Sequence, residues 1–200
     1  MLRGLSFCWV IIMISLVLNQ DAFKILTVFS LSPGSSFRRK ELKELTRLNN
    51  VPLDKALLRL SNSDVLRKKG TYFINMENQY AEAIIELCSK QHTQLKRIPL
   101  KVYFLITDFA FQASLFKGIE LYLFGSYSKL VFSEKSDIDI AVLTLQNAKP
   151  IKGLLLALAE KLGKSYGKEV QLHFFDKKSF YSNKKDPLVS EIIRNGVHLI

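Results

Sequence analysis

The spacing of apolar residues predicts a series of short helices in the first half of the chain. A first helix begins near Asp21, which we expect to cap it, and ends at the turn-forming residues 32–36. Ser36 is expected to cap a second helix, and Pro52 lies at the first position of a third. The same spacing predicts a fourth helix over residues 78–90.

A small basic hairpin is predicted after the third helix. Residues 65–69 and 71–76 have the composition of strands, and Gly70 provides the turn between them. Three helices followed by a hairpin is the order of a winged helix-turn-helix module, whose third helix and wing contact DNA. The candidate DNA-binding residues are Lys55, Arg59, Arg67, Lys68 and Lys69. A helical packing domain whose charges only face water is the alternative.

The second half of the chain has the pattern of a separate domain with strands and helices. A polar stretch, residues 91–97, precedes Pro99, which opens a long apolar helix. Strand and helix patterns then follow over residues 119–124, 137–143, 151–162, 169–175 and from Pro187 onward. The lysine-rich residues 177–185 are expected to form a connecting loop. We therefore expect two domains, over residues 19–97 and 98–200.

The first 18 residues form an apolar leader with two interpretations. Arg3 and the apolar run over residues 5–18 resemble a signal peptide, but no Ala-x-Ala-like cleavage site follows. The run is also shorter than the roughly 20 residues that span a bilayer as a helix. We expect that translation starts at Met13 and that residues 1–12 are a mis-assigned start. A membrane anchor is the alternative.

The charge of the chain indicates its type of partner, and its cysteine content indicates its compartment. The chain holds 29 Lys and Arg against 18 Asp and Glu, and this balance suits a polyanion such as nucleic acid or a nucleoside triphosphate. Cys8 and Cys88 are the only cysteines, which excludes a four-cysteine zinc site and favours a reducing, cytoplasmic compartment. His92, His173 and His198 lack metal-ligand spacing, and we expect them at surface or core-edge positions.

Two short motifs in the second half carry candidate chemistry. A strand pattern runs directly into Gly125 and Ser126, where the backbone can pass close to a ligand and a helix start offers free amides to phosphate oxygens. Ser136 then precedes a strand that carries Asp137 and Asp139 on one face. Two parallel carboxylates repel each other unless a cation lies between them, and such oxygen ligands select Mg²⁺ or Mn²⁺.

One known family shares these motifs. The segment Phe124–Ser126, followed by Ser136–Asp139, resembles the signature of minimal nucleotidyltransferases of the DNA polymerase β superfamily, as in archaeal and bacterial domains that often sit beside a winged helix. The resemblance covers roughly residues 116–200 and implies an α+β fold with a mixed sheet flanked by helices. It also implies transfer of a nucleotidyl group from a Mg²⁺-bound triphosphate, such as ATP, to a hydroxyl. The implied nucleotide-binding residues are Gly125, Ser126 and Ser136, and the implied catalytic metal ligands are Asp137 and Asp139.

Two positions depart from the family pattern. A second glycine usually follows the serine by four residues, and Leu130 stands there. The third carboxylate is expected on the strand over residues 169–175, where alternation makes Gln171 the matching position. An amide oxygen can bind Mg²⁺ but accepts no proton. Either Glu169 replaces the missing carboxylate, or transfer is weak.

These observations leave two functional hypotheses, neither of which involves a membrane. The first is an enzyme that nucleotidylates a hydroxyl acceptor, with a partner protein as one candidate acceptor. The second is a DNA-binding regulator or antitoxin-like protein whose nucleotidyltransferase half is weak or inactive. Asp137 and Asp139 favour the enzyme, whereas Gln171 and the basic N-terminal module favour the regulator.

Overall fold

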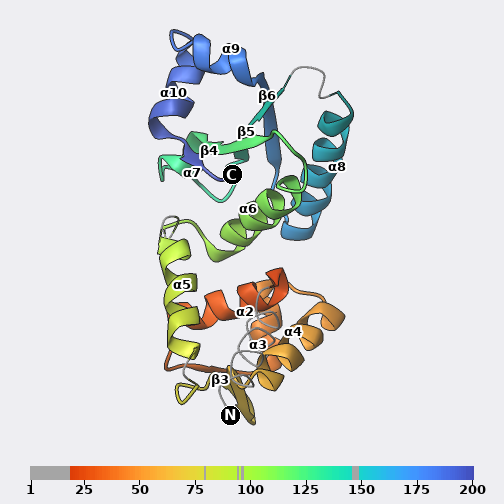
Figure 1. Cartoon of the computed structure of the whole chain (residues 1–200), viewed down its shortest axis with the longest axis vertical. Helices are drawn as coiled ribbons and strands as arrows, with labels where there is room; N and C mark the ends of the chain where they lie inside the picture. Colours follow the sequence, from red (N-terminus) through yellow and green to blue (C-terminus); the bar gives the residue numbers. More distant parts are fainter. Residues whose placement is uncertain (1–18, 79, 94, 96, 146–148) are drawn as a thin grey trace, which may run out of the picture. The chain divides into compact units, whose positions relative to one another are not determined.

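The chain divides into two compact units, one ending at Lys96 and one beginning at Arg97 (Figure 1). The computed structural model describes residues 19–78, 80–93, 95, 97–145 and 149–200. The apolar leader, and with it the choice between Met13 and an anchor, lies outside the described residues. Among the helices of the described residues, none combines the length and the apolar character that crossing a membrane requires.

The N-terminal unit combines helices with a small three-stranded sheet. Its elements are α2 (Gln20–Leu31), β1 (Ser36–Phe37), α3 (Arg39–Thr46), α4 (Asn50–Asn62), β2 (Leu66–Lys69), β3 (Thr71–Ile74) and α5 (Ala81–Thr93). The strand order is β1-β3-β2, with antiparallel pairing throughout. Gly70, with φ +76°, makes the tight turn of the hairpin. The four expected helices and the hairpin are present, whereas β1 has no counterpart among the expected elements.

Two predicted helix caps in this unit are wrong. The side chain of Asn19, rather than Asp21, caps α2 by accepting a hydrogen bond from the Ala22 amide at 2.7 Å. Ser36 caps no helix, because it lies in β1 and pairs with Phe73 of β3. A strand of two residues is defined by its partner in the sheet, and the local sequence carries little sign of it.

Helix α4 has the burial pattern that its sequence predicts. Its inward residues are Leu53, Ala56, Leu57 and Leu60. Lys55 and Arg59 lie on the exposed side. The guanidinium of Arg39 on α3 donates to both carboxylate oxygens of Asp54 on α4, at 2.6 and 2.8 Å. This bidentate pair is the geometry in which an exposed ion pair contributes most, and it links the two helices.

The C-terminal unit is built on a four-stranded mixed sheet. Its elements are α6 (Leu100–Ala113), β4 (Glu120–Phe124), α7 (Gly125–Ser128), β5 (Ile138–Thr144), α8 (Lys149–Tyr166), β6 (Val170–Asp176), α9 (Lys177–Ser182), α10 (Pro187–Asn195) and β7 (Val197–His198). The strand order is β6-β5-β4-β7. Strands β5 and β6 are parallel, and the other pairs are antiparallel. The expected α+β fold with a mixed sheet and flanking helices is confirmed.

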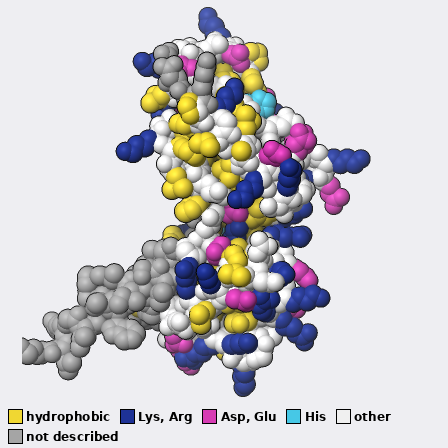
Figure 2. Space-filling view, turned by 90° about the vertical axis from the view of Figure 1, so that its right-hand side faces the viewer, with side chains coloured by type: hydrophobic (Ala, Val, Ile, Leu, Met, Phe, Trp, Pro, Cys, Tyr) yellow, Lys and Arg dark blue, Asp and Glu magenta, His cyan; other side chains and the backbone are white. Residues whose placement is uncertain are grey.

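Side-chain alternation directs the two faces of this sheet to different helices. Helices α9 and α10 cover one face, in a cluster of Phe124, Ala141, Leu143, Phe180, Val189 and Ile192. On the other face α8 packs against β6, and Nζ of Lys152 lies 4.7 Å from the centroid of the Phe174 ring. Figure 2 shows hydrophobic side chains gathered on the α8 side of this unit, where Leu154 and Leu156 are exposed.

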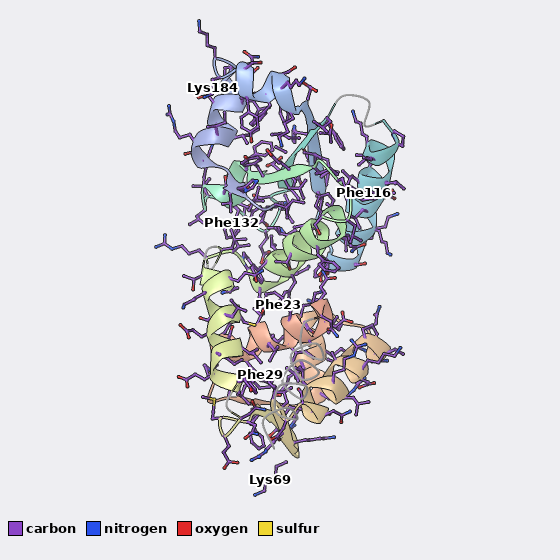
Figure 3. All side chains as sticks on the ribbon, viewed as in Figure 1. Phe23, Phe29, Lys69, Phe116, Phe132 and Lys184 are labelled. Carbon is purple, nitrogen blue, oxygen red and sulfur yellow. The ribbon has the colours of Figure 1, made fainter. Side chains whose placement is uncertain are left out.

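The lysine-rich segment after β6 is partly helical, so the expected loop is wrong over α9. The Asp176 side chain caps α9 by accepting a hydrogen bond from the Ser179 amide at 2.9 Å. Lys177 forms an ion pair with Glu120 of β4, which ties α9 to the sheet. Lys184, between α9 and α10, is exposed and points away from the fold (Figure 3).

Candidate active site

The candidate residues meet where β4 ends and β5 begins. Phe124 lies opposite Asp139 in the antiparallel β4–β5 pair, so the turn after β4 lies beside the first residues of β5. Asp137 directly precedes β5, and Asp139 is its second residue. Farther along the same face, Ala141 and Leu143 are buried under α9 and α10. The two aspartates therefore lie at the end of this face that the apolar cluster leaves open.

Gly125 is required at its position by both conformation and space. Its φ of +72° lies in the left-handed region, which glycine adopts without steric cost. A Cβ atom at this position would lie only 2.3 Å from Oδ2 of Asp139. Ser126 follows within α7, which is a single turn of four residues. Glycine thus allows the Asp139 carboxylate to lie directly against the backbone of the Gly125–Ser126 turn.

The neighbouring strand β6 brings an amide to Asp137. The parallel register places Gln171 opposite Asp139, and Nε2 of Gln171 donates to Oδ2 of Asp137 at 2.8 Å. Glu169 contacts β5 through its carbonyl oxygen, which accepts a hydrogen bond from the Ile138 amide at 2.9 Å. The Glu169 side chain itself is exposed. Of the two candidates for a third ligand, Gln171 is the one whose side chain contacts an aspartate.

Asp139 also contacts a histidine that the sequence did not single out. Nε2 of His173 lies 3.6 Å from Oδ1 of Asp139. The imidazole meets the Phe124 ring edge-on, with 5.0 Å between the ring centroids. Burial raises the pKa of Asp139 above its ordinary value, an effect that His173 opposes and that Asp137 increases. A bound divalent cation would oppose it further, because a cation favours the ionised carboxylate.

The side chains present fit a hard divalent cation together with a phosphate ligand. Asp137, Asp139 and Gln171 offer carboxylate and amide oxygens, which are the ligands that Mg²⁺ and Mn²⁺ prefer. Within the described residues, no three His, Cys, Asp or Glu side chains form a group that could hold a metal ion. Mg²⁺ is commonly bound by one or two carboxylates plus substrate phosphates, so a two-carboxylate site fits a metal that arrives with a triphosphate.

Ser136 shapes the turn that presents Asp137. Its Oγ accepts a hydrogen bond from the Ser133 amide at 2.8 Å. Nζ of Lys168 donates to the carbonyl oxygens of Glu134 and Ser136, the second at 3.4 Å. These contacts hold the segment between α7 and β5, so Ser136 has a structural role beside its expected role in nucleotide binding.

Leu130 has a backbone conformation that suits glycine, the residue that the family usually has at this position. Its φ is +59°, in the left-handed region, which costs a residue with a Cβ roughly 1–2 kcal/mol. The Val131 amide donates to the Ser126 carbonyl at 3.0 Å, and this bond closes the turn. Next to it, Lys129 forms an ion pair of 2.5 Å with Glu191 of α10. The turn therefore keeps its shape despite the leucine, with strain at one residue.

Leu130→Gly is expected to be more stable than Leu130→Ala by about 1 kcal/mol. Both changes remove the partly exposed leucine side chain, but only glycine relieves the left-handed strain, and this relief exceeds the extra freedom of glycine in the unfolded chain. Chemical denaturation of the two purified variants measures the difference. Equal stability, or a more stable alanine variant, would show that the turn is not strained at this residue.

The candidate DNA-binding residues lie on α4 and on the hairpin of the N-terminal unit. All five are exposed: Lys55, Arg59, Arg67, Lys68 and Lys69. Lys69 lies beside the hairpin turn and points outward (Figure 3). Arg67 instead pairs with Glu77 at 2.6 Å and with Asp64 at 3.2 Å. Its charge is compensated within the unit, which makes Arg67 the weakest of the five candidates.

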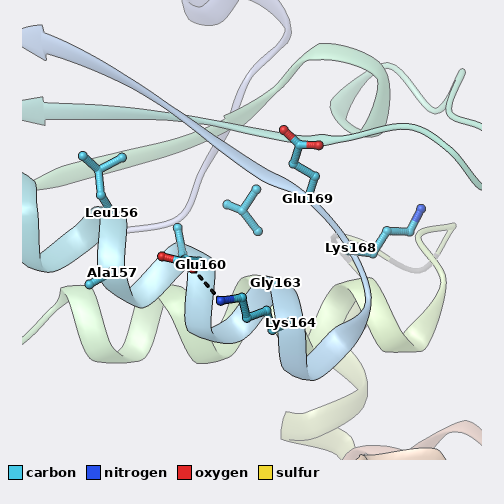
Figure 4. A pocket seen from close by; sticks show the side chains of 9 residues that line it. Leu156, Ala157, Glu160, Gly163, Lys164, Lys168 and Glu169 are labelled. Carbon is cyan, nitrogen blue, oxygen red and sulfur yellow. Dashed lines mark hydrogen bonds and ion pairs between the residues drawn. The ribbon is translucent and has the colours of Figure 1, made fainter.

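A groove of about 690 Å³ on the C-terminal unit lies apart from the aspartates (Figure 4). Leu156 and Ala157 of α8 line it, together with Glu160 and Lys164, which form an ion pair of 2.5 Å. Glu169 borders the groove, and in Figure 4 its side chain extends away from α8. The groove opens on the α8 face of the sheet, whereas the aspartates lie on the opposite face, so the groove is not part of the candidate active site.

Comparison with known families shows a similarity in the C-terminal unit. The model of a family described as "Nucleotidyltransferase domain" matches residues 109–197, a range that includes Gly125, Ser126, Asp137 and Asp139. Comparisons with curated proteins and with solved structures gave no match. The matched range begins inside α6 and ends in β7, so it contains every strand of the four-stranded sheet except the last residue of β7.

Proposed function

We propose that the chain, whose residues 109–197 match the model of a nucleotidyltransferase domain, transfers a nucleotidyl group from a nucleoside triphosphate to a hydroxyl acceptor. Mg²⁺ or Mn²⁺ bound by Asp137 and Asp139 would assist the transfer. One observation carries the proposal: both aspartates and the Gly125 turn converge at the open end of one sheet face, with the Asp139 carboxylate against the turn.

Each residue of this site has a distinct task in the proposed reaction. The Gly125–Ser126 turn binds the triphosphate through backbone amides and the serine hydroxyl. Asp137 and Asp139 hold the metal, which when bound neutralises charge on the phosphate oxygens. The acceptor oxygen forms a bond to the α-phosphorus while the bond to pyrophosphate breaks, and the hydroxyl proton leaves to water, so the protein contributes mainly position and charge.

Gln171 limits how the acceptor hydroxyl loses its proton. An amide accepts no proton at neutral pH, so Gln171 cannot act as the base that a third carboxylate would provide. Its oxygen could serve as a third metal ligand if the amide turned over, because amide oxygen and nitrogen have the same reach. Glu169 lies two residues before Gln171, and its exposed side chain is the alternative third ligand. Because the site lacks this base, we expect the rate of transfer to depend strongly on how the acceptor hydroxyl is positioned.

Transfer of an α-labelled nucleotide tests the proposal and identifies the acceptor class. The full chain is incubated with each labelled triphosphate, Mg²⁺ and a cell extract, and products are treated with protease or nuclease. Label that protease releases indicates a protein acceptor, and label that nuclease releases indicates nucleic acid. Metal-dependent triphosphate binding without any labelled product would favour the regulator hypothesis, in which the domain binds nucleotide without turning it over.

A second candidate function, DNA binding, rests on the topology of the N-terminal unit. The element order α2-β1-α3-α4-β2-β3 with the strand order β1-β3-β2 supports a winged helix-turn-helix interpretation. In this arrangement α4 would enter the major groove with Lys55 and Arg59, and the hairpin with Lys68 and Lys69 would contact phosphates. This function is compatible with either an active or an inactive nucleotidyltransferase domain.

Removing Lys68 and Lys69 together is expected to weaken duplex DNA binding and to reduce its dependence on salt by about one counterion per lost phosphate contact. Fluorescence anisotropy with the full chain at several salt concentrations measures both quantities. Lys90→Ala/Lys161→Ala removes the same charge from α5 and α8 and serves as the matched control. If both double variants lost the same DNA affinity, the binding would depend on overall charge and not on the proposed interface.

A further inference from the structure

His173 has a buried ring nitrogen to which the proposed reaction assigns no role. The side chain as a whole is 36% exposed, but Nε2 is buried and makes no hydrogen bond within the described residues. A buried polar atom without a partner is uncommon in native proteins and costs stability. This nitrogen faces the proposed metal ligand Asp139, whose Oδ1 lies 3.6 Å away, just beyond hydrogen-bond distance.

The fold holds the imidazole in this position from two directions. His173 lies opposite Ala141 in the parallel β5–β6 pair, two residues along the strands from the pair formed by Asp139 and Gln171. The Phe124 ring contacts the imidazole edge-on at 5.0 Å between centroids. Because Phe124 also precedes Gly125, one residue at the end of β4 supports both the histidine and the glycine turn.

Strand β6 thus presents two side-chain nitrogens to two carboxylates. Gln171 donates to Asp137 at 2.8 Å, and His173, two residues later on the same face, faces Asp139. The other oxygen of Asp139, Oδ2, lies against Gly125. Carboxylates that bind metals are usually oriented by hydrogen bonds of this kind, and losing such a partner typically weakens metal binding by roughly 10- to 100-fold.

We propose that His173 is a positioning residue for Asp139, whose Oδ1 accepts a hydrogen bond from Nε2 of His173 when the carboxylate binds the metal. The inference rests on the proposed function, because it assumes a metal at Asp137 and Asp139. It assigns Nε2 as the nitrogen that donates the N–H, which gives the buried atom the partner that it lacks. His173 would touch neither the triphosphate nor the acceptor.

Three variants of the full chain separate the nitrogen from the ring. His173→Phe keeps a ring against Phe124 but lacks the nitrogen, and His173→Gln keeps a side-chain N–H donor. His198→Phe is the matched control, because His198 in β7 contacts Tyr122 and not the aspartates. Electron paramagnetic resonance of free Mn²⁺ gives the dissociation constant of the metal alone, and thermal denaturation reports on folding.

We expect His173→Phe to weaken Mn²⁺ binding by about tenfold or more without lowering the melting temperature. His173→Gln should stay within about threefold of the wild type, and His198→Phe should not differ from it. The proposal is overturned if His173→Phe binds Mn²⁺ like the wild type, or if His173→Gln is as weak as His173→Phe. If His173→Phe does not fold, His173→Leu takes its place as the variant without the nitrogen.

Asp139→Asn separates a failure of this inference from a failure of the proposed function. If Asp139→Asn binds Mn²⁺ as tightly as the wild type, the metal site is wrong and the role of His173 fails with it. If Asp139→Asn loses Mn²⁺ while His173→Phe retains it, the metal site stands and only the positioning role of His173 is wrong.

Discussion

Gly125→Ala is expected to weaken Mg²⁺-dependent triphosphate binding by roughly 10- to 100-fold, because disturbing the groups that position a metal ligand typically costs this much affinity. The added Cβ would lie 2.3 Å from Oδ2 of Asp139, so either the carboxylate or the turn must move. The φ of +72° adds left-handed strain to the steric conflict. Isothermal titration calorimetry with Mg²⁺ and ATP measures the loss.

Gly70→Ala is the matched control for this variant. Gly70 has a similar φ of +76°, but a Cβ there would meet nothing within 4 Å. We expect this change to lower stability by about 1 kcal/mol through backbone strain alone and to leave triphosphate binding unchanged. If Gly125→Ala bound triphosphate as tightly as the wild type, or if both variants lost the same affinity, the contact between Gly125 and Asp139 would have no role in the site.

Gln171→Asp is expected to tighten Mg²⁺ binding on the order of tenfold and to raise transfer, because ligand charge sets the affinity of oxygen-ligand sites. The same change should destabilise the metal-free protein. It replaces a donor 2.8 Å from Oδ2 of Asp137 with a third negative charge. Melting temperatures with and without Mg²⁺, together with label incorporation into an acceptor, therefore test both directions of the effect.

Glu169→Gln is the companion variant, and we expect it to change little because the Glu169 side chain is exposed, and the hydrogen bond of Glu169 to Ile138 uses its backbone carbonyl. The reverse pattern would contradict this assignment. If Glu169→Gln abolished transfer while Gln171→Asp had no effect, Glu169 would be the third acid and the side-chain contact of Gln171 with Asp137 would be incidental.

The elements that local sequence controls are the ones that the sequence predicted well. The inward face of α4 and the hairpin around Gly70 follow from apolar spacing and turn chemistry. The strand β1 escaped prediction because its two residues are defined only by pairing with β3. Helix α9 could have been found, since Asp176 three residues before Ser179 is a capping signal.

The residues of the site were also predictable only where local sequence determines them. The motif around Gly125 and the two aspartates is local, so its residues and their spacing are visible in the sequence. The neighbours of those aspartates depend on the β5–β6 register, which periodicity alone does not determine. Alternation places Gln171 and His173 on one face, but it does not show that His173 lies next to Asp139. The left-handed φ of Leu130 is likewise a tertiary property that its residue type does not suggest.

Calorimetry of triphosphate binding with and without Mg²⁺ tests the central claim most directly, because it requires no knowledge of the acceptor. The wild-type chain is compared with the Asp137→Asn/Asp139→Asn double variant, which preserves side-chain size while removing both charges. The proposed site predicts that the wild type binds triphosphate only when Mg²⁺ is present and that the double variant loses this binding. Equal affinity in the two proteins, or wild-type binding that is indifferent to Mg²⁺, would contradict a metal site at Asp137 and Asp139.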